Sequence, residues 1–286
     1  MTRSRATAIG FIAVLLWALL ALFTVGSAPT PPLLLNTICF AIGGTFGLIW
    51  TARSGALWSL RTVPLKVYVF GTLGLFGYHA LYFSALRLAP AAEAGLIAYL
   101  WPLLIVVFSG FLPGERLRKG HLLGAALGFA GAALIITRGG LGLSSAHLPG
   151  YILAGLCALT WSGYSVLSRR VGDAPTATVA VFCLASAALS LPLHLMFEQT
   201  VLPQTTMGWA AIAGLGLGPV GLAFYVWDVG VKQGDIQLLG TSSYAAPLLS
   251  TLILVLADVA APSMTLLWAA LLSAGGAAVA ARASMR

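Results

Sequence analysis

The sequence contains little charge and no long polar segment. Charged residues make up 8% of its 286 residues and hydrophobic residues 59%, whereas about 25% of the residues in a soluble domain are charged. The gaps between its apolar runs are no longer than about a dozen residues, too short to hold a separate folded domain. An ordinary soluble globular protein is therefore excluded.

Residues that could drive or catalyse a reaction are also missing or scattered. No glycine-rich phosphate-binding loop is present, so ATP-driven pumping within this chain is excluded. All seven acids fall near the ends of apolar runs, which leaves no carboxylate at mid-membrane for a usual proton relay. No metal or cofactor is predicted, because the histidines lie in different segments. The acids are Glu93, Glu115, Asp173, Glu198, Asp228, Asp235 and Asp258.

Cysteine is rare as well. The three cysteines, Cys39, Cys157 and Cys183, lie in three different apolar runs. Lone thiols in such positions behave as small apolar side chains. We therefore predict neither a disulfide nor a metal role for them.

What the sequence does have is a series of apolar runs. A helix rises ~1.5 Å per residue, so about 20 residues cross the ~30 Å hydrocarbon core of a bilayer. Lipid offers no partner to bare backbone, and continuous runs favour helices over the alternating strands of a barrel. The sequence predicts an all-helical membrane protein. Its ten helices are expected at about 6–27, 32–52, 64–86, 91–112, 120–137, 149–169, 176–197, 207–228, 235–258 and 264–283.

The first run has a second interpretation. Arg3 and Arg5 precede it, as basic residues precede the core of a signal peptide. The run from Ala6 to Gly26 is longer than a usual signal core, and nine similar runs follow. We interpret it as the first spanning helix.

Lysine and arginine collect on one side of this predicted topology. Thirteen fall on one side and two, Arg87 and Arg138, on the other. Because such residues are retained in the cytoplasm, both termini are predicted to be cytoplasmic, in a bacterial inner membrane. The net charge of +8 then reflects helix ends, and no nucleic-acid partner is expected. The thirteen are Arg3, Arg5, Arg53, Arg61, Lys66, Arg116, Arg118, Lys119, Arg169, Arg170, Lys232, Arg282 and Arg286.

Two motifs recur at nearly constant spacing. Trp17 in LLWALLALF precedes Trp161 in LTWSGYSVL by 144 residues. Tyr99 in AYLWPLL precedes Tyr244 in SYAAPLL by 145 residues. Each copy has five helices, an odd number, so the copies are predicted to insert with opposite orientations, as in secondary transporters. The two copies are residues 1–140 and 141–286.

Further segments carry a family resemblance: LLW in the first helix, GERLRKGHLLGAALGFAGAALII across the fourth and fifth, and the tryptophan of the sixth. With the paired five-helix copies, they resemble the drug/metabolite transporter superfamily, specifically its EamA-type ten-helix members. The segments MTRSRATAIGFIAVLLW, AYLWPLL and YVWDVGVKQGDIQLLGTSSYAAPLLST look most like the members that export aromatic amino acids. The resemblance covers the whole chain and implies amino acid export without ATP hydrolysis. LADVAAP replaces the GERLRKG junction in the second copy, which leaves the end of the ninth helix open.

One ionisable side chain, His79, is predicted deep inside a helix. Because such a residue is costly in lipid, we expect a polar anchor facing the translocation path. A neutral histidine bonded to a neighbouring helix is the alternative. The aromatic residues near it would suit an aromatic or bulky apolar substrate, although for Tyr225 and Trp227 interfacial anchoring is an equal alternative. The candidate aromatic residues are Trp17, Tyr78, Tyr82, Tyr99, Trp101, Trp161, Tyr164 and Tyr244.

Polar residues and two prolines complete the predicted site. Gln237, Thr241 and Tyr244 form one stripe along the ninth helix, and Ser165 follows Trp161 by one turn in the sixth. Hydrogen bonds between helices are the alternative role for these side chains. Pro102 and Pro247 occupy matching places in the two copies, and proline bends a helix. We predict that both are hinges for alternating access.

Three classes of function remain. The first is a carrier that exports aromatic or other apolar amino acids, or more broadly drugs and metabolites, through a central cavity. The second is a membrane enzyme acting on a lipid, which would need clustered carboxylates, a metal or a nucleophile with its base. The third is a scaffold or receptor, which would not explain the repeat. The repeat and the resemblance favour the carrier, and one chain is enough to form the path, so a monomer is expected.

Overall fold

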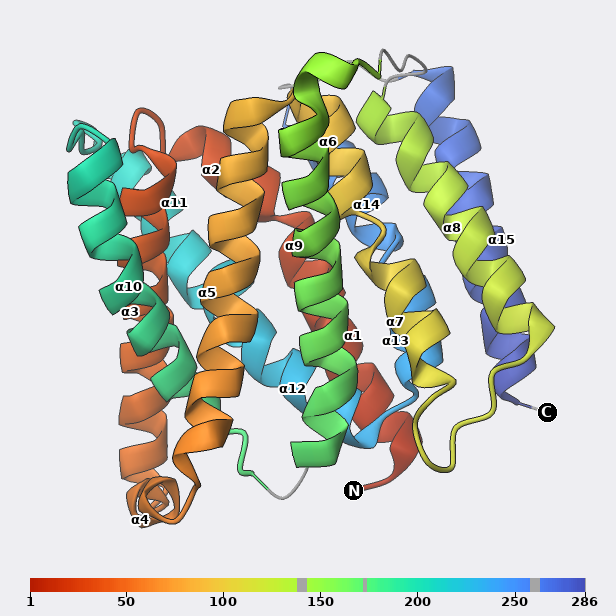
Figure 1. Ribbon diagram of the computed structural model, residues 1–286, viewed down its shortest axis with the longest axis horizontal. Coiled ribbons are helices and arrows are strands. Elements are labelled where there is room, and N and C mark those ends of the chain that lie inside the picture. Colours follow the sequence, from red (N-terminus) through yellow and green to blue (C-terminus); the bar gives the residue numbers. More distant parts are fainter. Residues whose placement is uncertain (138–142, 172–173, 258–262, 286) are drawn as a thin grey trace.

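The computed structural model of the chain is a bundle of helices (Figure 1), and it describes residues 1–137, 143–171, 174–257 and 263–285. Within these described residues, ten helices are long and apolar enough to cross a membrane. The all-helical class and the ten predicted spans are therefore confirmed. The predicted positions Arg138, Asp173, Asp258 and Arg286 lie outside the described residues.

The spanning helices are built from shorter elements, and α1 with α2, α6 with α7, and α13 with α14 each make one span. The eighth span joins α11, the π-helical turn η3 and α12. Short 3₁₀ turns flank α9, and the short helix α4 links the second span to the third. In chain order the elements are α1 (Arg3–Ala18), α2 (Leu20–Gly26), α3 (Pro32–Arg53), α4 (Leu57–Arg61), α5 (Leu65–Leu88), α6 (Ala91–Ala98), α7 (Trp101–Ser109), α8 (Lys119–Thr137), η1 (Ser145–His147), α9 (Leu148–Leu167), η2 (Ser168–Val171), α10 (Thr178–Phe197), α11 (Thr206–Leu217), η3 (Gly218–Leu222), α12 (Ala223–Gln233), α13 (Ile236–Ser242), α14 (Ala245–Leu256) and α15 (Met264–Ser284).

The eighth span differs from the sequence prediction, which ended it at residue 228. Its last element, α12, continues to Gln233, so Asp228 lies inside the helix. The Asp228 carboxylate accepts hydrogen bonds from Lys232 Nζ at 2.9 Å and from Thr176 Oγ1 at 2.7 Å. An acid and a lysine four residues apart face each other on a helix. Asp228 and Lys232 therefore form an ion pair inside the helix and do not mark its end.

The helices pack in pairs that have a simple numerical order. α1 packs on α12, α5 on α9, α3 on α10 and α8 on α15. In terms of spans, these pairs are first with eighth, third with sixth, second with seventh and fifth with tenth. If five is added to every span number, and ten is subtracted from any result above ten, the same four pairs are obtained. The two halves of the chain therefore make equivalent contacts.

Small residues allow the closest of these approaches. Gly10 of α1 lies against Gly230 of α12, and a Cβ atom on Gly10 would stand 2.7 Å from the Gly230 Cα atom. No side chain fits at that distance. Glycine at both positions is therefore what brings the first and eighth spans into backbone contact.

Both ends of the chain lie at one end of the bundle (Figure 1). We call it the N/C end, and the opposite end the far end. The first span runs from the N/C end to the far end, and the direction alternates from span to span, so α6 begins and α8 ends at the far end (Figure 1).

Candidate substrate cavity

A cavity of about 700 Å³ lies between the two halves of the bundle. Its size is within the range of about 300–1,000 Å³ usual for small-molecule sites. Seven aromatic side chains and one histidine line it together with small and aliphatic residues. The lining comprises Trp17, Leu20, Ala21, Tyr78, His79, Tyr82, Ala91, Ala92, Gly95, Tyr99, Trp101, Ile136, Thr137, Trp161, Pro219, Val220, Phe224, Ala246, Pro247 and Ser250.

The cavity occupies the half of the bundle nearer the far end. Its lining includes Ala91 and Ala92 at the start of α6 and Thr137 at the end of α8, and both of these positions are at the far end (Figure 1). In α1 and α7 the lining residues closest to the N/C end are Trp17 and Trp101. The cavity therefore opens toward the far end and stops at a layer of tryptophans.

Four tryptophans from four spans make this floor. Trp17 packs on Trp101 at a centroid distance of 5.9 Å, on Trp161 at 6.0 Å and on Trp227 at 5.1 Å. Trp227 is 1% exposed and does not line the cavity. The pairs with Trp101 and Trp161 are edge-to-face, a favourable arrangement for aromatic rings. The four rings form one packed layer below the cavity.

His79 stands in the cavity wall on α5. Its Nδ1 atom lies 2.8 Å from the Leu75 carbonyl oxygen of the preceding turn, so Nδ1 carries the proton and donates it. The ring meets Phe40 at 5.0 Å and Phe224 at 6.2 Å, both edge-to-face. The backbone and two rings thus fix the imidazole, and Nε2 is the nitrogen left to meet a ligand.

The structure brings together eight of the residues singled out from the sequence. They come from α1, α5, α7, α9, α14 and the turn before α7, and Tyr78 and Tyr82 stack face to face at 6.1 Å. Tyr99 lies in the turn between α6 and α7. The eight are Trp17, Tyr78, His79, Tyr82, Tyr99, Trp101, Trp161 and Pro247.

The other six do not line the cavity. Tyr164 lies behind Trp161, at a centroid distance of 5.3 Å, and packs over Gly74, where a Cβ would stand 2.4 Å from its ring. The Ser165 hydroxyl accepts a hydrogen bond from Trp227 Nε1 at 3.1 Å. Both residues support the floor from outside. The six are Tyr164, Ser165, Gln237, Thr241, Tyr244 and Pro102.

The stripe predicted on the ninth span is buried away from the cavity. Thr241 donates its hydroxyl to the Gln237 carbonyl oxygen at 3.0 Å, within its own helix. Gln237 is 2% exposed, and its side chain lies near the N/C end. Tyr244 is fully buried and accepts a hydrogen bond from the Leu103 N–H at 3.0 Å.

Phe224 is a lining residue that the sequence reasoning missed. It lies 145 residues after His79, the same spacing that relates Tyr99 to Tyr244, and the two rings touch in the cavity wall. The repeat could have identified it. Pro219 and Val220 of η3 were also missed, and no sequence signal marked their π-helical turn.

The described lining residues carry no formal charge. The polar groups are imidazole, phenol and indole, with the hydroxyls of Thr137 and Ser250. Several of them are engaged by backbone: Trp17 Nε1 donates to the Pro219 carbonyl oxygen at 3.2 Å, and the Thr137 hydroxyl donates to that of Ala133 at 2.8 Å. Such a surface can hold an apolar ring by stacking, a cation over ring faces and a carboxylate on N–H and O–H donors. No group of three His, Cys, Asp or Glu side chains that could hold a metal occurs among the described residues.

Comparison with known proteins places the chain among transporters. The sequence profile of the EamA-like transporter family matches it twice, over residues 5–137 and 148–282. The chain is 55% identical to the aromatic amino acid exporter YddG of Ancylobacter novellus, over 98% of each chain. It is 24% identical to the aromatic amino acid exporter YddG of Escherichia coli, over 88% of each. It is also 27% identical to the biotin transporter of Escherichia coli, over 64% of this chain and 61% of that one.

A solved crystal structure, 54% identical in sequence, has the same fold. It matches with a TM-score of 0.95 and covers 100% of this chain and 99% of that chain. The profile covers both halves, and the ten spans are those of a multi-pass membrane protein. The family expected from the sequence is confirmed: this chain belongs to the EamA-like transporter family.

Proposed function

We propose that this protein exports aromatic or other apolar amino acids from the bacterial cytoplasm, without ATP hydrolysis. The observation that carries the proposal is the cavity, because seven aromatic side chains and His79 line it and no described lining residue is charged. Aromatic rings contribute about 0.5–1.5 kcal/mol each when they pack edge-to-face or offset. The 55% identity to an aromatic amino acid exporter supports the same substrate class.

The direction of transport follows from a proposed orientation. The N/C end carries most of the lysines and arginines, and such residues stay in the cytoplasm. With the N/C end in the cytoplasm, the cavity opens to the outside and the tryptophan floor closes the inner side. We assign this structure to the outward-open state of an alternating-access cycle.

Two oppositely oriented repeats, residues 1–140 and 141–286, would interconvert the two states. Corresponding helices of the two repeats make corresponding contacts, which supports a two-fold relation between the repeats. Transporters with such repeats work by rocking one repeat against the other. Pro102 and Pro247 would be the hinges. One chain forms the whole cavity, which supports a monomer.

Eight substrate-binding residues are proposed here. A substrate ring would stack among the tyrosines and tryptophans, and its polar groups would meet His79 and the hydroxyls. Tyr164, Ser165, Gln237, Thr241 and Tyr244, also predicted from the sequence, would act by holding the elements that carry this surface. The proposed contacts are Trp17, Tyr78, His79, Tyr82, Tyr99, Trp101, Trp161 and Phe224.

A broad drug and metabolite exporter is the second candidate. A cavity of about 700 Å³ without charge would accept several apolar molecules, and the biotin transporter among the relatives carries a substrate that is not an amino acid. The two candidates differ in whether one substrate class is strongly preferred.

Efflux from liposomes containing the purified protein tests both candidates. The liposomes are preloaded in turn with labelled Phe, Tyr, Trp, Leu, Lys, Glu and a cationic dye, with and without an imposed pH gradient. We expect flux of the aromatic and apolar amino acids above that of protein-free liposomes, and little flux of Lys or Glu. Flux of the dye with none for any amino acid would overturn the substrate proposal. Dependence on the pH gradient would show coupling to protons.

A further inference from the structure

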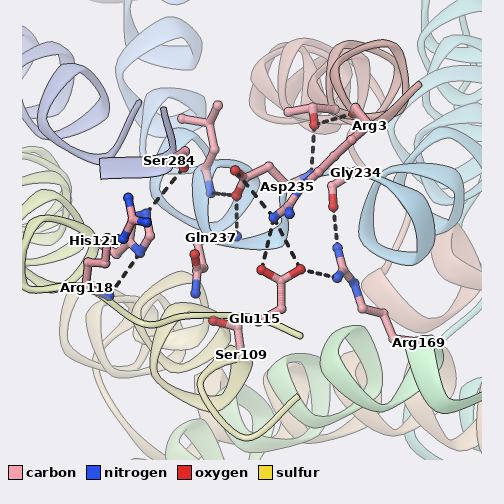
Figure 2. Close-up of polar contacts among 12 residues, drawn as sticks. Arg3, Ser109, Glu115, Arg118, His121, Arg169, Gly234, Asp235, Gln237 and Ser284 are labelled. Carbon is pink, nitrogen blue, oxygen red and sulfur yellow. Dashed lines mark hydrogen bonds and ion pairs between the residues drawn. The ribbon is translucent and has the colours of Figure 1, made fainter. Parts of the chain in front are cut away.

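A cluster of four charged side chains lies at the N/C end (Figure 2). Glu115 is its centre, and its side chain is 6% exposed. Arg3 Nη2 lies 2.9 Å from Glu115 Oε2 and 3.6 Å from Asp235 Oδ2. Arg169 Nη1 donates to the second oxygen of Glu115. Two cations and two anions therefore balance, and we call these four residues the Glu115 cluster.

The cluster also binds backbone, which fixes it to the helix ends. Arg169 Nε donates to the Val231 carbonyl oxygen at 2.5 Å, and Nη2 donates to that of Gly234. Asp235 caps α13 by accepting from the N–H groups of Gln237 and Leu238 at 3.1 and 2.9 Å. The end of α9 is thereby tied to the link between α12 and α13.

A further bond ties in the first helix. The Asp235 N–H donates to Thr7 Oγ1 at 2.8 Å, and the Thr7 hydroxyl donates to the Arg3 carbonyl oxygen at 2.8 Å. The first turns of α1 therefore contact the α12–α13 link through both a side chain and the backbone. Arg5, exposed nearby, is not part of these contacts.

The segments that carry the cluster are those that carry the tryptophan floor. Arg3 and Trp17 belong to α1, and Glu115 follows Trp101 along the chain by 14 residues, the same separation as Arg3 from Trp17. In the second repeat, Arg169 follows Trp161 by eight residues. The fourth tryptophan, Trp227, precedes the fourth charged residue, Asp235, by the same eight residues. Most of each eight-residue separation is helical, with a rise of ~1.5 Å per residue, so the charges lie well below the floor.

Two successive layers therefore close the path at the N/C end. The upper layer is the aromatic floor, and the lower layer joins the same four segments by ion pairs and backbone bonds. For the N/C end to open, these segments have to separate. That movement would leave Glu115 without either arginine, and breaking a largely buried ion pair is unfavourable.

We propose that the Glu115 cluster is the inner gate of this transporter and stabilises the state that is closed at the N/C end. The proposal rests on the alternating-access function proposed above. Glu115 is the shared partner of Arg3, from the first repeat, and Arg169, from the second. Among the described residues, Glu115 is the only carboxylate that contacts both Arg3 and Arg169, and replacing it removes this shared partner. The equilibrium then shifts toward the state open at the N/C end.

The test measures opening directly, apart from transport. Spin labels are placed on cysteines at Arg116 and Arg170, which are exposed at the N/C end beside two cluster residues. The buried native cysteines, Cys39, Cys157 and Cys183, are replaced by alanine. Distances between the labels are measured by pulsed electron resonance in lipid nanodiscs. The test variants are Glu115→Gln and Arg169→Gln, and Arg5→Gln is the matched control.

Wild type and Arg5→Gln are expected to give one main short distance. Glu115→Gln is expected to raise the ratio of long to short distances at least about tenfold, a change of about 1.4 kcal/mol. Arg169→Gln is expected to act in the same direction, and it carries the test if Glu115→Gln does not fold. An unchanged distance distribution in a folded variant of either kind, or equal opening in Arg5→Gln, would overturn the gate.

The outcomes also separate this proposal from the transport function. If Glu115→Gln opens the N/C end but liposomes show no amino acid flux, the gate stands and the substrate proposal falls. If wild-type liposomes transport amino acids while neither variant shifts the distances, the transport function stands and the gate proposal is wrong.

Discussion

Tyr99 and Tyr244 each place a hydroxyl group at the break in the other's helix. The Tyr99 hydroxyl donates to the Ser243 carbonyl oxygen at 3.4 Å. That oxygen also accepts from the Ala246 N–H at 3.1 Å, but it has no donor four residues on because residue 247 is proline. The Tyr244 hydroxyl accepts from the Leu103 N–H at 3.0 Å, just after the break between α6 and α7. The two rings lie 6.0 Å apart. The two breaks are therefore one connected unit.

Removing the Tyr244 hydroxyl is expected to weaken this unit without changing the cavity surface. Tyr244→Phe leaves the Leu103 N–H without its partner, and an unsatisfied buried donor costs about 1–3 kcal/mol. We expect a lower midpoint of thermal unfolding in detergent, followed by tryptophan fluorescence, and little change in the substrate concentration for half-maximal export. Tyr68→Phe removes a hydroxyl that donates to the Leu60 carbonyl oxygen, away from the helix breaks. It is the control for the effect of removing any bonded tyrosine hydroxyl. An equal midpoint for Tyr244→Phe and wild type would contradict the linkage.

His79→Ala is expected to reduce export from liposomes about two- to thirteenfold, the effect of removing one polar interaction of ~0.5–1.5 kcal/mol. The backbone holds Nδ1, so the substitution is expected to act on substrate through Nε2, the nitrogen without a backbone partner. His79→Gln, which keeps a donor and an acceptor, should retain part of the flux. His147→Ala changes a histidine outside the cavity and should export like wild type. Wild-type flux in well-folded His79→Ala would count against the proposed anchor.

The spans and much of the cavity wall could be predicted because membrane insertion leaves strong signals. Lipid demands long apolar helices, and an intramembrane histidine such as His79 is rare enough to mark a cavity. The repeat related Trp17 to Trp161, and both rings line the cavity. These inferences needed only hydropathy, rarity and spacing.

Side-chain direction could not be predicted in the same way. Tyr244 matches Tyr99 in the repeat, yet its ring points toward α8 because Gly128 leaves room for it, where a Cβ would stand 2.5 Å from the ring. Which face of the ninth span meets the cavity depends on such contacts between distant segments. Phe224 was overlooked for the opposite reason, since an apolar ring in an apolar helix gives no signal of its own. Hydropathy alone predicts Asp228 at a helix end, because it takes no account of the neutralising Lys232 four residues later.

Asp228 and Lys232 are expected to matter as a pair. Asp228→Asn leaves the lysine, 7% exposed, without a counter-ion, and breaking a buried pair from one side costs about 3–5 kcal/mol. The double variant Asp228→Asn, Lys232→Gln removes both charges and should recover most of the stability. Unfolding midpoints of wild type, both single variants and the double variant complete the cycle. Additive losses in the double variant would show that the two side chains act independently.

Pro102 is expected to limit stability and permit motion. Alanine at this position adds an N–H group that can bond back across the break. Pro102 is the second residue of α7, where proline is well tolerated, so the gain is smaller than the ~3 kcal/mol of a proline in a helix interior. Pro102→Ala should therefore join α6 to α7 more firmly and unfold at the same or a higher temperature. Because Pro102 does not itself line the cavity, the concentration for half-maximal export should change less than the maximal rate does.

The rate of export should fall in the same variant, because a continuous helix cannot bend as the proposed alternating-access cycle requires. Pro247→Ala is expected to do the same, and its new N–H would compete with Tyr99 for the Ser243 carbonyl oxygen. Pro192→Ala is the matched control, since this proline lies inside α10, which contributes no residue to the cavity lining. Maximal export rates from liposomes with equal protein content decide the question. If Pro102→Ala and Pro247→Ala export as fast as Pro192→Ala, the breaks are static features and the bending during transport occurs elsewhere.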